Sequence, residues 1–155
     1  LEAWHETFDL NLTSLMLSNR AAIRQFLKQG SGGVLLNLSS VLAFSPSSKH
    51  FTTHAYAAAK SAVIGFSKSL AATYASNSIR VNVIAPGLMD TPMSSRAVND
   101  PAIMKYLSEK QPLQGGRVGK SDDLDGMVCQ LLSDQTSFIT GQVIAVDGGW
   151  SVTGA

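Results

Sequence analysis

The sequence predicts an α/β fold of the doubly wound type, in which helices cover a parallel sheet. Two observations predict it. Three short, almost continuous apolar runs are typical of strands that are buried on both faces, as in parallel sheets. Helical patterns alternate with these runs, and such alternation favours right-handed crossovers between neighbouring parallel strands. With 155 residues, 45% apolar and 15% charged, the chain has the size and composition of one globular domain.

The first expected element is a long helix over residues 4–27, where apolar side chains recur at helical spacing. Three glycines at positions 30, 32 and 33 end it. They precede a strand, whereas a dinucleotide-binding glycine loop follows one, so we interpret them as a helix stop and a tight turn. The run "VLLNLSS" then predicts the first strand at about 34–40.

The next elements repeat this order. A second long helix is expected over about 54–77, and "IRVNVIAPG" predicts a second strand at about 79–85, which Pro86 and Gly87 stop.

Two helices and a strand complete the chain. Asp100 followed by proline is a typical N-cap, which predicts a helix over about 101–110. Ser121 is expected to cap another helix that runs to about residue 133. The third strand is expected at about 142–147.

Charge and composition exclude several classes of function. The net charge is +1 and no basic run occurs, so we expect neither nucleic acid nor a membrane as a partner. No apolar run reaches the ~18 residues of a membrane span. The single cysteine, Cys129, rules out an internal disulfide, favours a cytoplasmic location and is expected to be a small core residue because its neighbours are apolar. We expect no metal site.

The chemistry is concentrated around the stretch "AYAAAKSAVIGFSKSL". Tyr56 and Lys60 are four residues apart, so on a helix their side chains leave the same face about one turn apart. Alone this pattern is weak, because chance gives it roughly once in seven such chains. However, Ser40 ends the first strand and Pro86–Gly87 end the second. Carboxyl ends of parallel strands share one sheet edge, which is where ligands bind.

Several motifs in order along the whole chain resemble the short-chain dehydrogenase/reductase family. They are the asparagine in "FDLNL", then "LNLSS", "YAAAK", "IRVNVIAPG" with a threonine shortly after, and "ITGQVIAVDGG". The resemblance implies a Rossmann-type fold and hydride exchange between NAD or NADP and a small-molecule alcohol or carbonyl compound.

The resemblance also implies roles for single residues. Tyr56 would be the general acid/base, Ser40 would contact the substrate oxygen, Lys60 would bind the nicotinamide ribose beside Tyr56, and Asn11 would belong to a proton relay. A free tyrosine has a pKa near ~10, and we expect the Lys60 ammonium and the cationic nicotinamide ring to lower it. The groups expected to hold the nicotinamide carboxamide are the backbone of Pro86, Gly87 and Leu88 and the hydroxyl of Thr91.

Two features depart from the family pattern. The interval from Ser40 to Tyr56 is 16 residues, a few more than usual, so we expect a bulged loop in "SPSSKHFTT". The glycine-rich cofactor fingerprint does not occur, so residues 1–155 are expected to be one N-terminally incomplete domain that lacks roughly 100 residues and is inactive alone.

Other interpretations stay open. The chain could be a non-catalytic remnant, or a cofactor-retaining epimerase or dehydratase that uses the same tyrosine–lysine pair. The apolar stripes of the two long helices, taken with the resemblance, imply a homotetramer or homodimer. The resemblance leaves the substrate, the choice between NAD and NADP and the reaction direction open.

Overall fold

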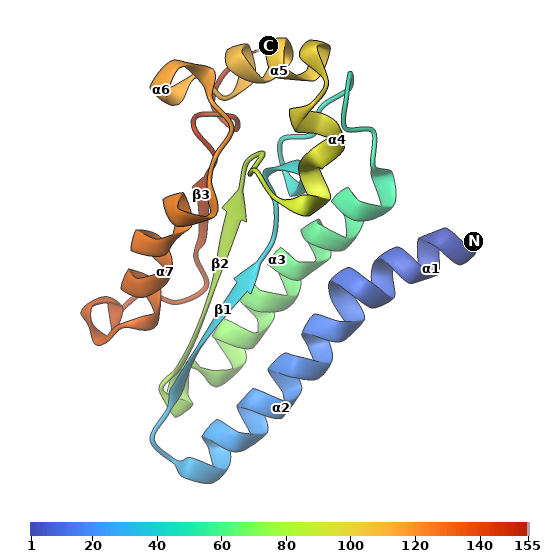
Figure 1. The fold of residues 1–155 in the computed structure, drawn as a ribbon. Helices are drawn as coiled ribbons and strands as arrows, with labels where there is room; N and C mark the ends of the chain where they lie inside the picture. The colour runs from blue at the N-terminus through green and yellow to red at the C-terminus, as the bar shows by residue number, and fades with distance from the viewer. Residues whose placement is uncertain (155) are drawn as a thin grey trace.

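A computed structural model describes residues 1–154 (Figure 1). Its sheet has three parallel strands in the order β1-β2-β3, with β1 at Gly33–Leu38, β2 at Ile79–Pro86 and β3 at Val143–Val146. The central strand β2 is buried from Ile79 to Ala85, as predicted for a strand covered on both faces, and this includes the polar side chains of Arg80 and Asn82. The predicted parallel sheet is therefore confirmed, with strand ends that differ by one or two residues.

The first helical region is one continuous rod (Figure 1, blue). Helix α1 (Glu2–Phe8) passes through a π-helical turn at Asp9–Thr13 into α2 (Ser14–Gln29). Gly30 ends it with a left-handed backbone conformation at φ 70°, which confirms the interpretation of the glycines as a helix stop.

Helix α3 (His54–Tyr74) crosses between β1 and β2 and continues as a 3₁₀ turn at Ala75–Asn77. It lies beside the α1–α2 rod on one side of the sheet, whereas α7 (Asp125–Leu132) lies on the other (Figure 1). Helices on both sides of a parallel sheet define the doubly wound arrangement that the sequence predicts.

Between β2 and α7 the chain forms short helices at the carboxyl end of the sheet. They are a 3₁₀ turn at Pro92–Ser94, α4 (Ser95–Val98), α5 (Pro101–Lys110) and α6 (Leu113–Gly116). The Asp100 carboxylate accepts hydrogen bonds from the N–H groups of Ala102 and Ile103, at 2.9 and 3.3 Å, so the predicted cap is confirmed.

Two predictions in the α7 region are wrong. Ser121 does not cap the helix: Lys120 is the N-cap of a 3₁₀ turn at Ser121–Leu124, and the Asp123 carboxylate accepts the Lys120 N–H at 2.7 Å. Cys129 is exposed. Leu131 is the buried residue of α7, and a residue two positions away points to nearly the opposite side of a helix. A second 3₁₀ turn, Asp134–Thr136, follows α7.

Buried polar side chains tie the layers together. The Arg80 guanidinium on β2 donates to the carbonyl oxygens of Leu131, Ser133 and Ile139, which fixes the segment after α7 to the sheet. Asn37 on β1 pairs with Asn19 on α2. Within the described residues no helix combines the length and the hydrophobicity needed to cross a membrane.

Candidate functional site

Ser40 lies where β1 ends at the carboxyl edge of the sheet. It is 8% exposed and begins the 3₁₀ turn Val41–Ala43, and its Oγ accepts the Leu42 N–H at 3.2 Å. Its neighbour Ser39 donates from Oγ to the carbonyl oxygen of Lys60 at 2.8 Å. The strand end is therefore joined directly to α3.

Tyr56 and Lys60 leave the same face of α3, as their spacing predicts. The Lys60 Nζ lies 5.5 Å from the centroid of the Tyr56 ring and donates to the carbonyl oxygen of Leu38 at 3.1 Å. This bond and the Ser39 bond connect β1 and α3 in both directions. The structure thus brings Ser40, Tyr56 and Lys60 together beyond the end of β1.

Burial dominates the electrostatics of Tyr56 in this structure. Burial raises the pKa of Tyr56 above its ordinary value, and the Ser40 hydroxyl offsets part of this by favouring the phenolate. Burial also lowers the pKa of Lys60. Desolvation of the phenol therefore dominates in the chain by itself, and the lowering of the Tyr56 pKa by Lys60 and the nicotinamide ring together stays a prediction. At neutral pH Tyr56 is a protonated phenol that can donate its proton.

Asn11 lies in the π-helical turn, which packs against α3. Its Nδ2 donates to the carbonyl oxygen of Thr7 at 2.9 Å, within the same helical rod. The structure thus places the segment of Asn11 beside the helix that carries Tyr56 and Lys60, with the amide group engaged by its own helix.

The loop after β2 holds the second group of candidate residues. Gly87 has no space for a side chain, since a Cβ there would collide with Gln111 Oε1 and come within 3.0 Å of the Asp147 backbone. The N–H of Leu88 donates to Gln111 Oε1 at 3.0 Å. The Leu88 carbonyl oxygen accepts Gln111 Nε2 at 3.3 Å and the Gly119 N–H at 3.0 Å. Both peptide groups of Leu88 are thus already engaged.

Ser94 organises the rest of this loop. Its single hydroxyl proton is directed at the Met89 carbonyl oxygen at 2.6 Å, with the Thr91 carbonyl oxygen also within reach at 2.9 Å. The same Oγ accepts the Thr91 N–H at 2.9 Å and lies 3.3 Å from Thr91 Oγ1. Among the described residues the Met89 N–H has no hydrogen-bond partner. Sequence reasoning missed Met89, Ser94 and Gln111. A proline–glycine pair marks such a loop but does not show which of its peptide groups are free.

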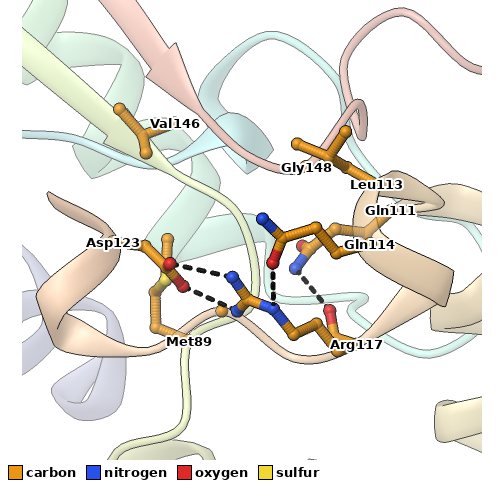
Figure 2. A pocket seen from close by; sticks show the side chains of 9 residues that line it. Met89, Gln111, Leu113, Gln114, Arg117, Asp123, Val146 and Gly148 are labelled. Carbon is orange, nitrogen blue, oxygen red and sulfur yellow. Dashed lines mark hydrogen bonds and ion pairs between the residues drawn. The ribbon is translucent and has the colours of Figure 1, made fainter.

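A cavity of about 180 Å³ lies beyond the ends of β2 and β3 (Figure 2). The Arg117 guanidinium forms a two-pronged ion pair with Asp123 across it, at 2.7 and 2.8 Å, and holds the pKa of that carboxyl well below its usual range. The lining residues are Met89, Gln111, Leu113, Gln114, Arg117, Gly119, Asp123, Val146 and Gly148. Ser40, Tyr56 and Lys60 are not among them, so the cavity lies on the Met89 and Gln111 side of the candidate site. In residues 1–154 no cluster of His, Cys, Asp and Glu suits a metal ion.

Comparison with known proteins agrees with this geometry. A family model described as enoyl-(acyl carrier protein) reductase matches residues 1–151. The 3β-hydroxysteroid dehydrogenase 1 of Eggerthella lenta is 40% identical over 152 residues, which are 98% of this chain and 56% of that protein. The chain therefore spans little more than half the length of this relative.

Solved structures share the fold. A gluconate 5-dehydrogenase from Burkholderia cenocepacia, in complex with NADP and tartrate, has a TM-score of 0.91 and 31% identity, over 99% of this chain and 58% of that one. A 4-hydroxyisoleucine dehydrogenase mutant complexed with NADH and succinate has a TM-score of 0.90 and 27% identity, over 99% and 61%. These similarities confirm the predicted Rossmann-type arrangement of strands and helices.

Proposed function

The chain belongs to the short-chain dehydrogenase/reductase family, and on this premise we propose that the full-length protein is an NAD(P)-dependent oxidoreductase. It interconverts a small-molecule alcohol and a carbonyl compound. The observation that carries the proposal is the cluster of Ser40, Tyr56 and Lys60, held together by hydrogen bonds between β1 and α3.

In this proposal the substrate oxygen lies between two hydroxyl groups. In the reductive direction Ser40 donates a hydrogen bond to the developing alkoxide and Tyr56 transfers its proton to it. The raised pKa of Tyr56 keeps the phenol protonated for this step. In the oxidative direction the same phenol, once ionised, accepts the proton. Lys60 favours that ionised form and binds the ribose, and Asn11 joins the proton relay once its amide turns away from Thr7.

The loop after β2 fits one end of a nicotinamide cofactor. When bound, NAD or NADP supplies or accepts the hydride. The unpaired N–H of Met89 and the hydroxyl of Thr91 are the donors available for its carboxamide, and the backbone of Pro86 and Gly87 lines the approach. Because the Leu88 peptide groups are engaged, the proposal gives Met89 the role that the sequence suggested for Leu88.

Two further parts of the proposal concern the setting of the enzyme. Exposed apolar side chains on the α1–α2 rod, Trp4, Leu10 and Leu17, suit a homodimer or homotetramer in which this rod packs against a second copy. The single free cysteine fits a cytoplasmic location.

The test is Tyr56→Phe in the full-length protein, with Tyr74→Phe on the same helix as the matched control. We expect Tyr56→Phe to lower turnover by about 10²–10⁴-fold, because it removes the proton donor. The dissociation constant of the reduced cofactor should stay within about twofold, which fluorescence titration measures. A Tyr56→Phe rate above roughly a tenth of wild type would show that another group transfers the proton.

Product analysis completes the test. Equal amounts of carbonyl product and reduced cofactor support the oxidoreductase. A product that forms without net change in NADH or NADPH would instead indicate a cofactor-retaining epimerase or dehydratase.

A further inference from the structure

Gln111 follows α5 directly and is 3% exposed, yet its side chain is fully hydrogen-bonded. Its Oε1 accepts the Leu88 N–H at 3.0 Å, and its Nε2 donates to the carbonyl oxygens of Leu88 (3.3 Å) and Arg117 (3.2 Å). Figure 2 shows the amide of Gln111 turned toward the Arg117 backbone. A buried amide with both ends paired specifies one orientation for the groups that it binds.

The surroundings of Gln111 are shaped around this side chain. A Cβ at Gly87, just after β2, would collide with Gln111 Oε1. A Cβ at Gly148, just after β3, would lie 2.5 Å from Gln111 Cγ. Two strand ends thus carry glycine where any side chain would displace Gln111, which supports a positional role for this residue.

The bonds of Gln111 and of the Gly119 backbone together determine where the Met89 N–H points. In a trans peptide the carbonyl oxygen and the following N–H lie on opposite sides of the bond. The Leu88 carbonyl oxygen is directed at Gln111 Nε2 and at the Gly119 N–H. The Met89 N–H, on the same peptide, is therefore directed away from Gln111.

The next peptide is held in the same way. Ser94 Oγ binds the Met89 carbonyl oxygen at 2.6 Å, and the Asp90 N–H donates to the Gly119 carbonyl oxygen at 2.7 Å. Two successive peptides of the loop therefore have fixed orientations, the first through Gln111 and the Gly119 N–H, and the second through Ser94 and the Gly119 carbonyl oxygen.

We infer that Gln111, with Ser94, is a positioning residue for the cofactor: it fixes the β2 loop so that the Met89 N–H and the Thr91 hydroxyl face the nicotinamide carboxamide. The inference rests on the proposed function. Gln111 acts through the backbone and touches neither substrate nor cofactor. Loss of the Gln111 side chain weakens binding of the nicotinamide end of the cofactor and leaves binding of the rest of the cofactor unchanged.

The experiment compares two ligands that differ only at that end. We would titrate the full-length protein with NADH and with ADP-ribose, which lacks the nicotinamide, or with NADPH and 2′-phospho-ADP-ribose if the wild type prefers NADPH. Gln111→Met keeps the length and most of the volume of the side chain but removes its hydrogen bonds. Gln114→Met is the matched control, because Gln114 is exposed, lines the same cavity and binds Arg117 Nε instead of the loop.

We expect Gln111→Met to raise the dissociation constant of NADH about fivefold, which corresponds to roughly one neutral hydrogen bond, and to leave that of ADP-ribose within about twofold of wild type. Gln114→Met should change neither dissociation constant. Ser94→Ala, a small truncation of a half-buried residue, should show the same selective loss of NADH affinity. It provides the test if Gln111→Met does not fold.

Two results would overturn the inference. Equal weakening of NADH and ADP-ribose would mean that Gln111 only supports the fold, and unchanged NADH affinity in both variants would mean that the loop does not need these bonds. A wild-type protein that binds neither ligand would refute the proposed function itself, and this inference with it.

Discussion

The buried amide pair between α2 and β1 yields a prediction whose size follows from the hydrogen bonds. Asn19 and Asn37 exchange two bonds of 3.0 Å, and Asn37 Nδ2 also donates to Ser67 Oγ on α3 at 2.9 Å. The three residues are 4%, 5% and 1% exposed. We expect Asn37→Leu to leave Asn19 Oδ1 without a partner in the core.

The other groups keep a second bond after this change. Asn19 Nδ2 still donates to the Leu15 carbonyl oxygen, and Ser67 Oγ still donates to that of Val63. One unpaired buried acceptor costs about 1–3 kcal/mol, so we expect Asn37→Leu to lower the free energy of unfolding by about 2 kcal/mol. Asn19→Leu should cost a similar amount, because it leaves Asn37 Oδ1 unpaired.

The double variant distinguishes this explanation from simple loss of packing. With leucine at both positions no unpaired amide remains, so the double variant should cost less than about 1 kcal/mol, well below the sum of the single changes. Urea unfolding measures the free energies, and each kcal/mol should also shift the melting temperature by about 2–4 °C. The exposed Asn99→Leu is the control, expected within about 0.5 kcal/mol of wild type. Additive losses in the double variant would refute the reasoning.

Two further predictions concern the phenol and the sheet edge. Because burial raises the pKa of Tyr56, the tyrosinate absorbance that Tyr56→Phe removes should appear at higher pH than that of a free tyrosine when no cofactor is bound, and oxidised cofactor should shift it to lower pH. An ionisation near neutral pH without cofactor would contradict this. Residues 1–155 expressed alone should self-associate through the edge strand β1, whose Leu38 is 53% exposed. Light scattering should show less association for Leu38→Lys than for the wild type. A monodisperse wild-type monomer would refute association through this strand.

The sequence predicted those features that depend on local patterns. The i, i+4 spacing placed Tyr56 and Lys60 on one face of α3, and Asp100 before a proline marked the start of α5. Parallel strands share a carboxyl edge, so the position of Ser40 near Tyr56 also followed from the order of elements.

The remaining features depend on tertiary contacts. The pKa of Tyr56 is decided by how much water the fold removes from the phenol, which no spacing reveals. Cys129 has apolar neighbours in sequence, but the direction from which the sheet meets α7 decides which side is buried. Gln111 lies 23 positions from Leu88 and ends an ordinary helix, so only the folded chain shows that its amide holds the loop.

The two halves of the candidate site are held by different hydrogen bonds and meet through the strand ladder. Ser39 and Lys60 join β1 to α3 on the side where we propose proton transfer, whereas Gln111 and Ser94 fix the loop after β2 on the side where we propose the cofactor. The β1–β2 pairing relates these halves, and the Ser39 N–H donates to the Ile84 carbonyl oxygen at 2.8 Å where the ladder ends. Val41, next to Ser40, also shares with Leu107 an apolar cluster against which Leu88 packs.

A shift of β1 by one residue would turn its side chains to the opposite face and remove Asn37 from Asn19. The amide pair therefore does more than stabilise the core. By fixing the register of β1, it sets the position of Ser40 relative to the Met89 N–H. In the proposed function this position determines the distance over which a proton and a hydride reach the same substrate carbon–oxygen bond.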